Sequence, residues 1–136
     1  MNVLVDTSVW SEFLRRRSNK SSNVSIELKN LIDNHQVSMI GPIRQELLSG
    51  IKNKSEFEIL KDRLHAFPDE IIQTTDYETA AEYFNICRSK GIQGSFIDYL
   101  ICAISSRHNL SIFTLDKDFN SYSKYLPIIL HKSPAS

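Results

Sequence analysis

The sequence contains little of what marks secreted, fibrous or membrane-embedded chains. Its two cysteines among 136 residues, Cys87 and Cys102, show no C-x-x-C spacing, which predicts reduced thiols in an apolar core. Four glycines and four prolines exclude a collagen-like chain. No apolar run approaches the roughly 18 residues of a transmembrane helix, and the first residues lack the basic region of a signal peptide. We therefore expect a cytoplasmic protein that does not enter a membrane.

An excess of charge of one sign is also absent. The 16 basic residues equal the 16 acidic residues, which argues against a protein that coats nucleic acid through its overall charge. The bases are unevenly placed, however, and four of them gather at Arg15, Arg16, Arg17 and Lys20. Such a local basic rim can steer a polyanion to one site. The alternative for these four side chains is a solvated helix end.

Several common motifs for cofactors and nucleophiles are missing. Neither a P-loop nor a dinucleotide fingerprint occurs, and there is no G-x-S-x-G elbow. The four histidines form no i, i+4 pair and have no neighbouring thiols, so a zinc site is not expected. The Asp-x-Asp at 116–118 fails as an EF-hand loop, because Ser121 and Pro127 stand where glycine and a bidentate glutamate are required.

Short apolar runs that alternate with amphipathic stretches predict the fold class. They indicate one α/β domain over residues 1–131, with a tail over 132–136 and a central parallel sheet of about five short strands flanked by helices. We expect strands over 3–5, 36–40, 71–72, 110–114 and 128–130. We expect helices after Asp6, over 24–34, 41–50 and 55–65, from a capping box at Thr75–Glu78 to Gly91, and from Ser95 onwards, with a turn or short helix over 116–122.

Carboxylates fall where this topology would bring them together. The carboxyl ends of parallel strands meet at one sheet edge, and acids follow the strands or begin the helices there: Asp6, Glu46, Asp98, and Asp116 with Asp118. Each has a purely structural alternative, as a helix cap, a capping-box acid, a turn former or an exposed helix residue. A cluster without bases would repel itself, and a hard divalent cation held by oxygen ligands would neutralise it.

Four segments carry a resemblance to a known family. They read Val-Asp-Thr-Ser-Val-Trp at 5–10, Gly-Pro-Ile-Arg-Gln-Glu-Leu-Leu-Ser-Gly at 41–50, Ile-Asp-Tyr-Leu-Ile-Cys-Ala at 97–103 and Thr-Leu-Asp-Lys-Asp-Phe at 114–119. In order and spacing they resemble the motifs of PIN domains, and more narrowly those of VapC toxins from type II VapBC toxin–antitoxin pairs. The resemblance covers nearly the whole chain.

The resemblance implies an endoribonuclease that depends on Mg²⁺ or Mn²⁺, forms a homodimer and is inhibited by a VapB-type antitoxin. By position, Asp6, Glu46, Asp98 and Asp116 match the catalytic acids, with Asp6, Asp98 and Asp116 as metal ligands. Ser8, Thr114 and Asp118 match supporting positions, and relatives differ in whether the acid at 116 or at 118 has the main role. The basic residues from Arg15 to Lys20 become candidate RNA contacts. Trp10 and Phe13 suggest an apolar groove for the antitoxin, with core packing as the alternative.

The chemistry of phosphodiester hydrolysis agrees with these residue types, because ions held by carboxylates supply an activated water and a sink for charge. Three alternatives remain. A receiver-like Mg²⁺-binding signalling module needs adjacent acids after the first strand, where only Asp6 stands. A phosphatase of the haloacid dehalogenase type needs an aspartate where Ser8 stands. A non-catalytic RNA-binding module gains nothing from acids that face a polyanion.

Overall fold

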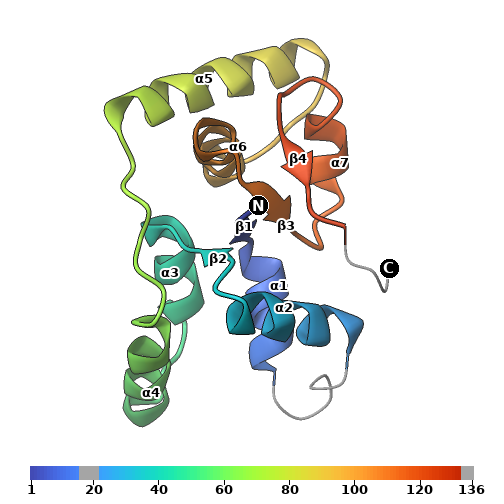
Figure 1. The fold of residues 1–136 in the computed structure, drawn as a ribbon. Coiled ribbons are helices and arrows are strands. Elements are labelled where there is room, and N and C mark those ends of the chain that lie inside the picture. Colours follow the sequence, from blue (N-terminus) through green and yellow to red (C-terminus); the bar gives the residue numbers. More distant parts are fainter. Residues whose placement is uncertain (16–21, 133–136) are drawn as a thin grey trace.

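A computed structural model describes residues 1–15 and 22–132. A parallel sheet in the order β2-β1-β3-β4 lies at its centre (Figure 1), which confirms the predicted α/β class. The strands are short: β1 (Val3–Val5), β2 (Val37–Ser38), β3 (Ser111–Phe113) and β4 (Ile129–Leu130). Parallel pairing of so few residues needs cover on both faces of the sheet, and helices provide it.

The central strand fixes where its neighbours end. Val3 of β1 is in register with Val37 on one side and with Ser111 on the other, and Val5 is in register with Phe113. All three residues of β1 and of β3 are buried. The chain therefore leaves β1 and β3 at the same height of the sheet, and the Asp6 amide donates to the Phe113 carbonyl oxygen over 2.9 Å.

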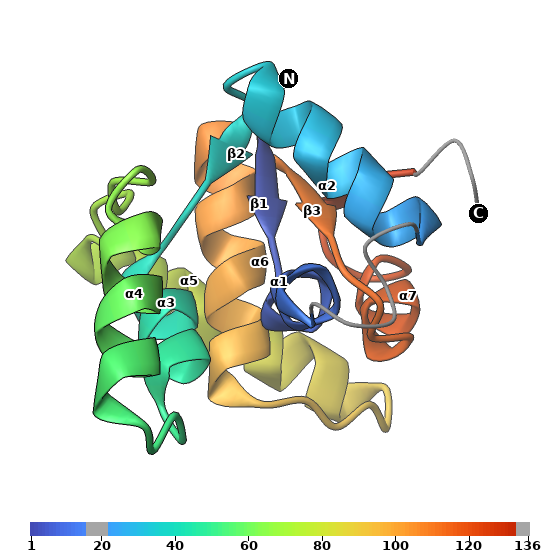
Figure 2. The ribbon, with the colours of Figure 1, turned by 90° about the horizontal axis from the view of Figure 1, so that it is seen from below.

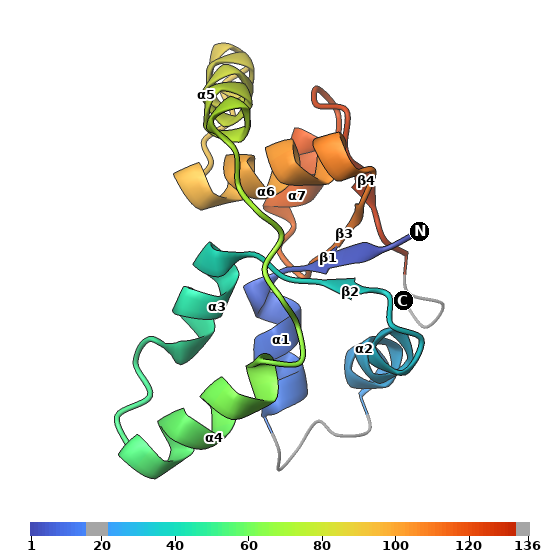
Figure 3. The same ribbon diagram turned by 60° about the vertical axis from the view of Figure 1, so that its left-hand side comes forward.

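Seven helices surround the sheet in the described part of the chain. They are α1 (Thr7–Leu14), α2 (Asn23–Asp33), α3 (Gly41–Leu48), α4 (Lys54–Leu64), α5 (Thr74–Ser89), α6 (Phe96–His108) and α7 (Asp118–Tyr122). Figure 3 shows α5 and α6 on one side of the sheet and α1 and α2 on the other. In Figure 2 the same two layers enclose β1. Every residue of α6 from Tyr99 to Ser105 is buried, so this helix forms the centre of one layer.

The core contains the residues expected there. Cys87 and Cys102 are buried free thiols, which confirms the prediction from their spacing, and burial raises the pKa of each. Trp10 is 2% exposed and packs edge-to-face on Phe67. Its core role is thereby confirmed, and Trp10 does not line a groove for a partner.

The predicted strand at 71–72 is wrong, so the sheet has four strands and not about five. Only Asp69 pairs with the sheet, through a single bridge to Met39. Residues 71–72 form no strand, and the Ile71 carbonyl oxygen accepts a hydrogen bond from Arg107 over 3.0 Å. The Ile71 side chain is 78% exposed, which shows that its apolar character did not mark a buried strand.

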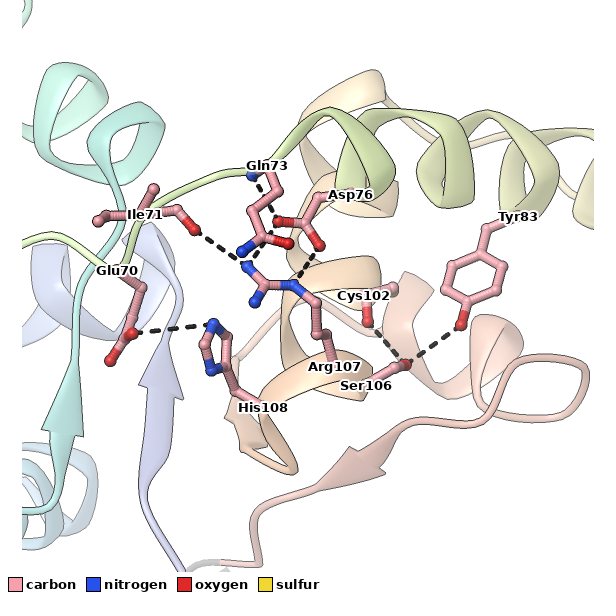
Figure 4. A network of polar contacts seen from close by, with 9 residues as sticks. All are labelled: Glu70, Ile71, Gln73, Asp76, Tyr83, Cys102, Ser106, Arg107 and His108. Atoms are coloured by element: carbon pink, nitrogen blue, oxygen red, sulfur yellow. Dashed lines mark hydrogen bonds and ion pairs between the residues drawn. The ribbon is translucent and has the colours of Figure 1, made fainter.

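The capping box of α5 lies two residues earlier than predicted. Gln73 is the N-cap, and its backbone amide donates to the Asp76 carboxylate over 2.8 Å. The same carboxylate accepts two 2.7 Å hydrogen bonds from Arg107 at the end of α6 (Figure 4). Asp76 therefore fixes both the start of α5 and its attachment to α6.

This pair gives the first prediction. The hydrogen bonds from Arg107 hold the pKa of Asp76 below its ordinary value, with a smaller lowering from the Gln73 amide, against an opposing effect of burial. We expect Asp76→Asn to lower the free energy of unfolding at pH 7 by about 2 kcal/mol, because it leaves Arg107 without its ionic partner. The difference should shrink in urea unfolding as the pH falls below about 4, where the Asp76 carboxyl of the unfolded chain becomes protonated, and it should vanish only below the lowered pKa of the folded protein. Asp33→Asn, in the exposed pair with Lys29, is the control and should change little. A loss that is equal at pH 3 and pH 7 would contradict the ionic explanation.

Some predictions concern residues outside the described part of the chain. Arg16, Arg17, Lys20 and residues 133–136 of the expected tail lie there. α1 ends at Leu14, and Arg15 is its C-cap. No helix among the described residues combines the length and the apolar character needed to cross a bilayer.

Candidate active site

Asp6 stands at the junction of β1 and α1 and does not use its side chain as a helix cap. It occupies the N-cap position of α1, yet no cap hydrogen bond is formed by the carboxylate. Instead Oδ2 accepts hydrogen bonds from the Thr114 hydroxyl over 2.7 Å and from the Ser8 hydroxyl over 3.1 Å. The alternative that Asp6 serves only as a helix cap is therefore wrong, because its carboxylate accepts no backbone amide of α1.

Ser8 and Thr114 join the ends of β1 and β3. Their hydroxyl oxygens lie 3.4 Å apart, and each also accepts a backbone amide from the loop after β3. Ser8 accepts the amide of Leu115, and Thr114 accepts the amide of Asp116, both over 3.0 Å. These hydrogen bonds join the Asp6 carboxylate to the loop that carries Asp116.

Asp98 lies in the first turn of α6, where Ser95 is the N-cap and accepts the Asp98 amide over 3.1 Å. The predicted helix start is confirmed. The half-buried carboxylate does more than complete a capping box, because Oδ2 accepts the Tyr122 hydroxyl over 2.6 Å. Burial raises the pKa of Asp98 most, and the negative charges of Asp116 and Asp6 raise it further, against hydrogen bonds from Tyr122 and Ser95. Three acids from separate segments are therefore close enough for their charges to interact.

Asp116 and Asp118 differ in what they face. Oδ1 of Asp116 accepts the Asp118 amide over 2.9 Å, so one oxygen does form the predicted turn contact. The charge of Asp116 acts on Asp98, whereas the charge of Asp118 acts on the buried Tyr122 hydroxyl. Both side chains are exposed. The geometry favours Asp116 as the inner acid, and its main role stays a prediction.

Glu46 lies at the edge of the cluster. It is exposed on α3, and its Oε1 accepts the Thr7 hydroxyl of α1 over 2.8 Å. It also lines a groove of about 1050 Å³ between α1, α3 and α4, together with Arg15. Arg15 is exposed and lies 3.7 Å from Glu12. Glu46 is not among the acids whose charges act on Asp98, which are Asp6 and Asp116 (with Asp98, the three inner acids). It is open to a ligand that enters along this groove.

The donor chemistry of the cluster fits a hard divalent cation. Asp6, Asp98 and Asp116 offer only carboxylate oxygens, and within residues 1–15 and 22–132 none of them forms an ion pair with a base. Burial raises the pKa of Asp98 most, and this uncompensated charge raises it further. In the same part of the chain, no three side chains of His, Cys, Asp or Glu are grouped at ligand distance as they stand.

Comparison with known proteins decides the family. The family model described as PIN domain matches residues 3–125, nearly the whole chain. The chain belongs to the PIN domain family. The three inner acids, Glu46 and the supporting hydroxyls all lie within the matched region of this PIN domain.

Solved structures share the fold of this PIN domain. FitAcB from Neisseria gonorrhoeae is 22% identical, with a TM-score of 0.77, and the match covers 96% of this chain and 97% of that chain. VapBC2 from Rickettsia felis, bound to a DNA fragment from its promoter, is 16% identical with a TM-score of 0.77 and coverage of 96% and 98%. FitAB bound to an IR36 DNA fragment is 19% identical with a TM-score of 0.76 and coverage of 95% and 93%. No curated protein sequence matches this chain.

Two contacts of the PIN domain site were not predicted. Thr7 holds Glu46, and its position inside the first motif could have suggested a polar role. Tyr122 holds Asp98 from α7, 24 residues further along the chain, and nothing in its sequence context signals this contact. Its expected place was only the end of a short turn.

The second prediction follows from the repulsion between the carboxylates of Asp98, Asp116 and Asp6. Asp116→Asn should stabilise the metal-free protein by roughly 0.5 kcal/mol, since it removes one of the charges that oppose Asp98 and water screens this exposed side chain. The Asn side-chain oxygen can still accept the Asp118 amide. Millimolar Mg²⁺ should then raise the unfolding temperature of wild type more than that of the variant. Thermal unfolding of both proteins in EDTA and in Mg²⁺ provides the measurement. If the variant is less stable in EDTA and gains as much from Mg²⁺, Asp116 is only a turn former.

Proposed function

We propose that this PIN domain is a divalent-metal-dependent endoribonuclease that acts as the toxin of a toxin–antitoxin pair. PIN domains are in general nucleases, which supports hydrolysis of phosphodiester bonds as the reaction class. The observation that carries the proposal is the set of contacts made by the Asp6 and Asp98 carboxylates. Asp6 stands at the N-cap of α1 and Asp98 in the first turn of α6, and each carboxylate accepts a hydroxyl from a distant segment, Thr114 and Tyr122 respectively. The charges of Asp6 and Asp116 both act on Asp98.

Asp6, Asp98 and Asp116 are the residues that would hold Mg²⁺ or Mn²⁺. A bound divalent ion would supply a nucleophile at neutral pH and a sink for charge on the phosphate. Ser8 and Thr114 keep the Asp6 carboxylate turned toward the loop after β3. Glu46, exposed and steadied by Thr7, is placed to orient a water molecule or a further ligand at the mouth of the site. No histidine base is needed in this scheme.

One proposed RNA contact, Arg15, lies beside the groove that Glu46 lines, and the other three are outside the described residues. Those three, Arg16, Arg17 and Lys20, follow Arg15 in the sequence. Positive side chains at this mouth would offset the repulsion between the acids and an RNA backbone. Asp118 would add an outer acid to the site.

The proposed partners are a VapB-type antitoxin and a second copy of the chain. VapBC2 and FitAB, whose folds this chain shares, support a two-component system. Apolar side chains of Leu14, Leu47, Ile59 and Leu60 line the groove between α1, α3 and α4, so an amphipathic segment of an antitoxin could cover it. The proposed surface for the homodimer lies on α5 and α6. A cavity of about 360 Å³ opens between these helices, and Phe96, which lines it, is 79% exposed, so a second copy of the chain could cover it.

The test is cleavage of RNA by the purified protein. We expect cuts in the presence of Mg²⁺ or Mn²⁺, no cuts in EDTA, and recovery when excess metal is added back. Binding of RNA without cleavage under any of these metals would favour the non-catalytic RNA-binding alternative. Equal cleavage with and without EDTA would contradict the metal dependence.

A further inference from the structure

The hydroxyl of Tyr122 is the unusual contact of this site. Tyr122 has no exposed surface, and its ring packs against Tyr99 and Phe119 with centroids 5.1 and 5.0 Å away. Its hydroxyl nevertheless leaves this apolar packing to donate to Oδ2 of Asp98 over 2.6 Å. A buried tyrosine so placed joins the hydrophobic core under α6 and α7 directly to one of the inner acids.

Gly94 makes room for that hydroxyl. A Cβ atom at this position would overlap the Tyr122 hydroxyl, and it would lie 2.7 Å from the Tyr99 hydroxyl and 2.8 Å from its ring carbon Cζ. No side chain larger than hydrogen fits there without moving the two tyrosines. The segment just before α6 is thus closed over the Tyr122 hydroxyl, which limits the directions in which it can donate.

The contact restricts the Asp98 carboxylate. A free aspartate rotates broadly about its last side-chain bond, whereas a charge-assisted hydrogen bond to Oδ2 selects one orientation and occupies one oxygen. Partners of this kind orient metal ligands, and their loss costs about 10- to 100-fold in metal affinity or activity. If Tyr122 only filled the core, loss of its hydroxyl would change neither the metal affinity nor the activity.

We propose that Tyr122 is a positioning residue of the active site, which holds Asp98 in the orientation that binds the divalent cation, with Gly94 providing the space that this requires. The inference rests on the proposed function, because it assumes that Asp98 is a metal ligand. It extends that function to a residue of the core that none of the four sequence motifs contains.

The test compares Tyr122→Phe with wild type in the intact protein. Phenylalanine keeps the ring and its packing and removes only the hydroxyl. We expect the apparent Kd for Mn²⁺ alone, measured by calorimetry without RNA, to rise about 10-fold, and kcat for RNA cleavage to fall while KM for RNA stays nearly unchanged. Tyr83→Phe is the matched control. Its hydroxyl donates to Ser106 over 3.3 Å, away from the acids, and its loss should leave Mn²⁺ affinity unchanged.

A double-mutant cycle tests the role of Gly94. Gly94→Ala should displace the Tyr122 hydroxyl and weaken Mn²⁺ binding in the wild-type background. In the Tyr122→Phe background the hydroxyl is already gone, so the same change should weaken binding clearly less. Fully additive effects would mean that Gly94 acts on the site by another route, and the part of the inference that concerns Gly94 would be overturned.

The outcomes separate this inference from the proposed function. If wild type binds Mn²⁺ and cleaves RNA, and Tyr122→Phe does both within about twofold of wild type, Tyr122 is only a core residue and the inference is overturned. If wild type itself neither binds Mn²⁺ nor cleaves RNA, the proposed function fails and the inference fails with it. A lower unfolding temperature for Tyr122→Phe with unchanged Mn²⁺ affinity also counts against the inference.

Discussion

Asp98→Asn is expected to lower the rate of RNA cleavage by at least about 10²-fold, because it removes a metal ligand whose charge no other group replaces. The Asn side chain has nearly the same shape, and its carbonyl oxygen can still accept the Tyr122 hydroxyl. The change also relieves the repulsion from Asp6 and Asp116 that raises the pKa of Asp98. The variant should therefore fold at least as well as wild type in EDTA, so that lost cleavage reports on chemistry and not on unfolding.

The measurement is single-turnover cleavage of one RNA by wild type and variant at saturating Mn²⁺, with thermal unfolding of both proteins as the check on folding. Asp33→Asn is the matched control, since it makes the same change in an exposed ion pair on α2 and should cleave at the wild-type rate. Asp6→Asn should resemble Asp98→Asn. A wild-type rate for Asp98→Asn in a folded protein would remove Asp98 from the site.

Growth of a bacterial host provides the second large effect. Induced expression of the wild-type chain should reduce the number of surviving colonies by orders of magnitude, because an active endoribonuclease destroys RNA that the cell needs. Expression of Asp98→Asn should leave growth normal. Co-expression of the small open reading frame next to the gene should restore growth with the wild-type chain, and its product should co-purify with it.

Three results would separate the parts of this expectation. If expression of the chain is harmless although the purified protein cleaves RNA, the proposed nuclease activity stands and the proposed role as a toxin is contradicted. A toxic chain whose Asp98→Asn variant is equally toxic would mean that toxicity comes from something other than the acid cluster. Failure of the neighbouring product to bind or to restore growth would contradict the proposed antitoxin.

The sequence predicted the parts of the site that depend on strand ends. Asp6 follows β1 and Thr114 follows β3, and the parallel register of Val5 with Phe113 brings the two side by side. Ser8 and Asp116 come with them, since each lies two residues further along the same segments. This convergence follows from topology alone, because the carboxyl ends of parallel strands meet at one edge.

The errors arose where a side chain serves a distant partner. The Thr75–Glu78 pattern predicts the start of α5 at Thr75, but Asp76 accepts hydrogen bonds from Arg107, 31 residues later, and the helix begins at Thr74. Ile71 is apolar, yet its side chain is exposed and its carbonyl oxygen accepts a hydrogen bond from Arg107. Tyr122 reaches Asp98 only because Gly94 leaves space above it. Local patterns carry no information on such tertiary contacts.

The chemistry at the cut ends tests the nuclease claim most directly. RNA of known sequence is incubated with purified wild-type protein and Mn²⁺, and the termini of the fragments are determined by labelling and sequencing. Hydrolysis by an external water, as expected for ions held by Asp6, Asp98 and Asp116, predicts a 5′-phosphate and a 3′-hydroxyl at each cut and no cuts in EDTA. Fragments that end in a 2′,3′-cyclic phosphate, or cuts that persist in EDTA, would contradict the account.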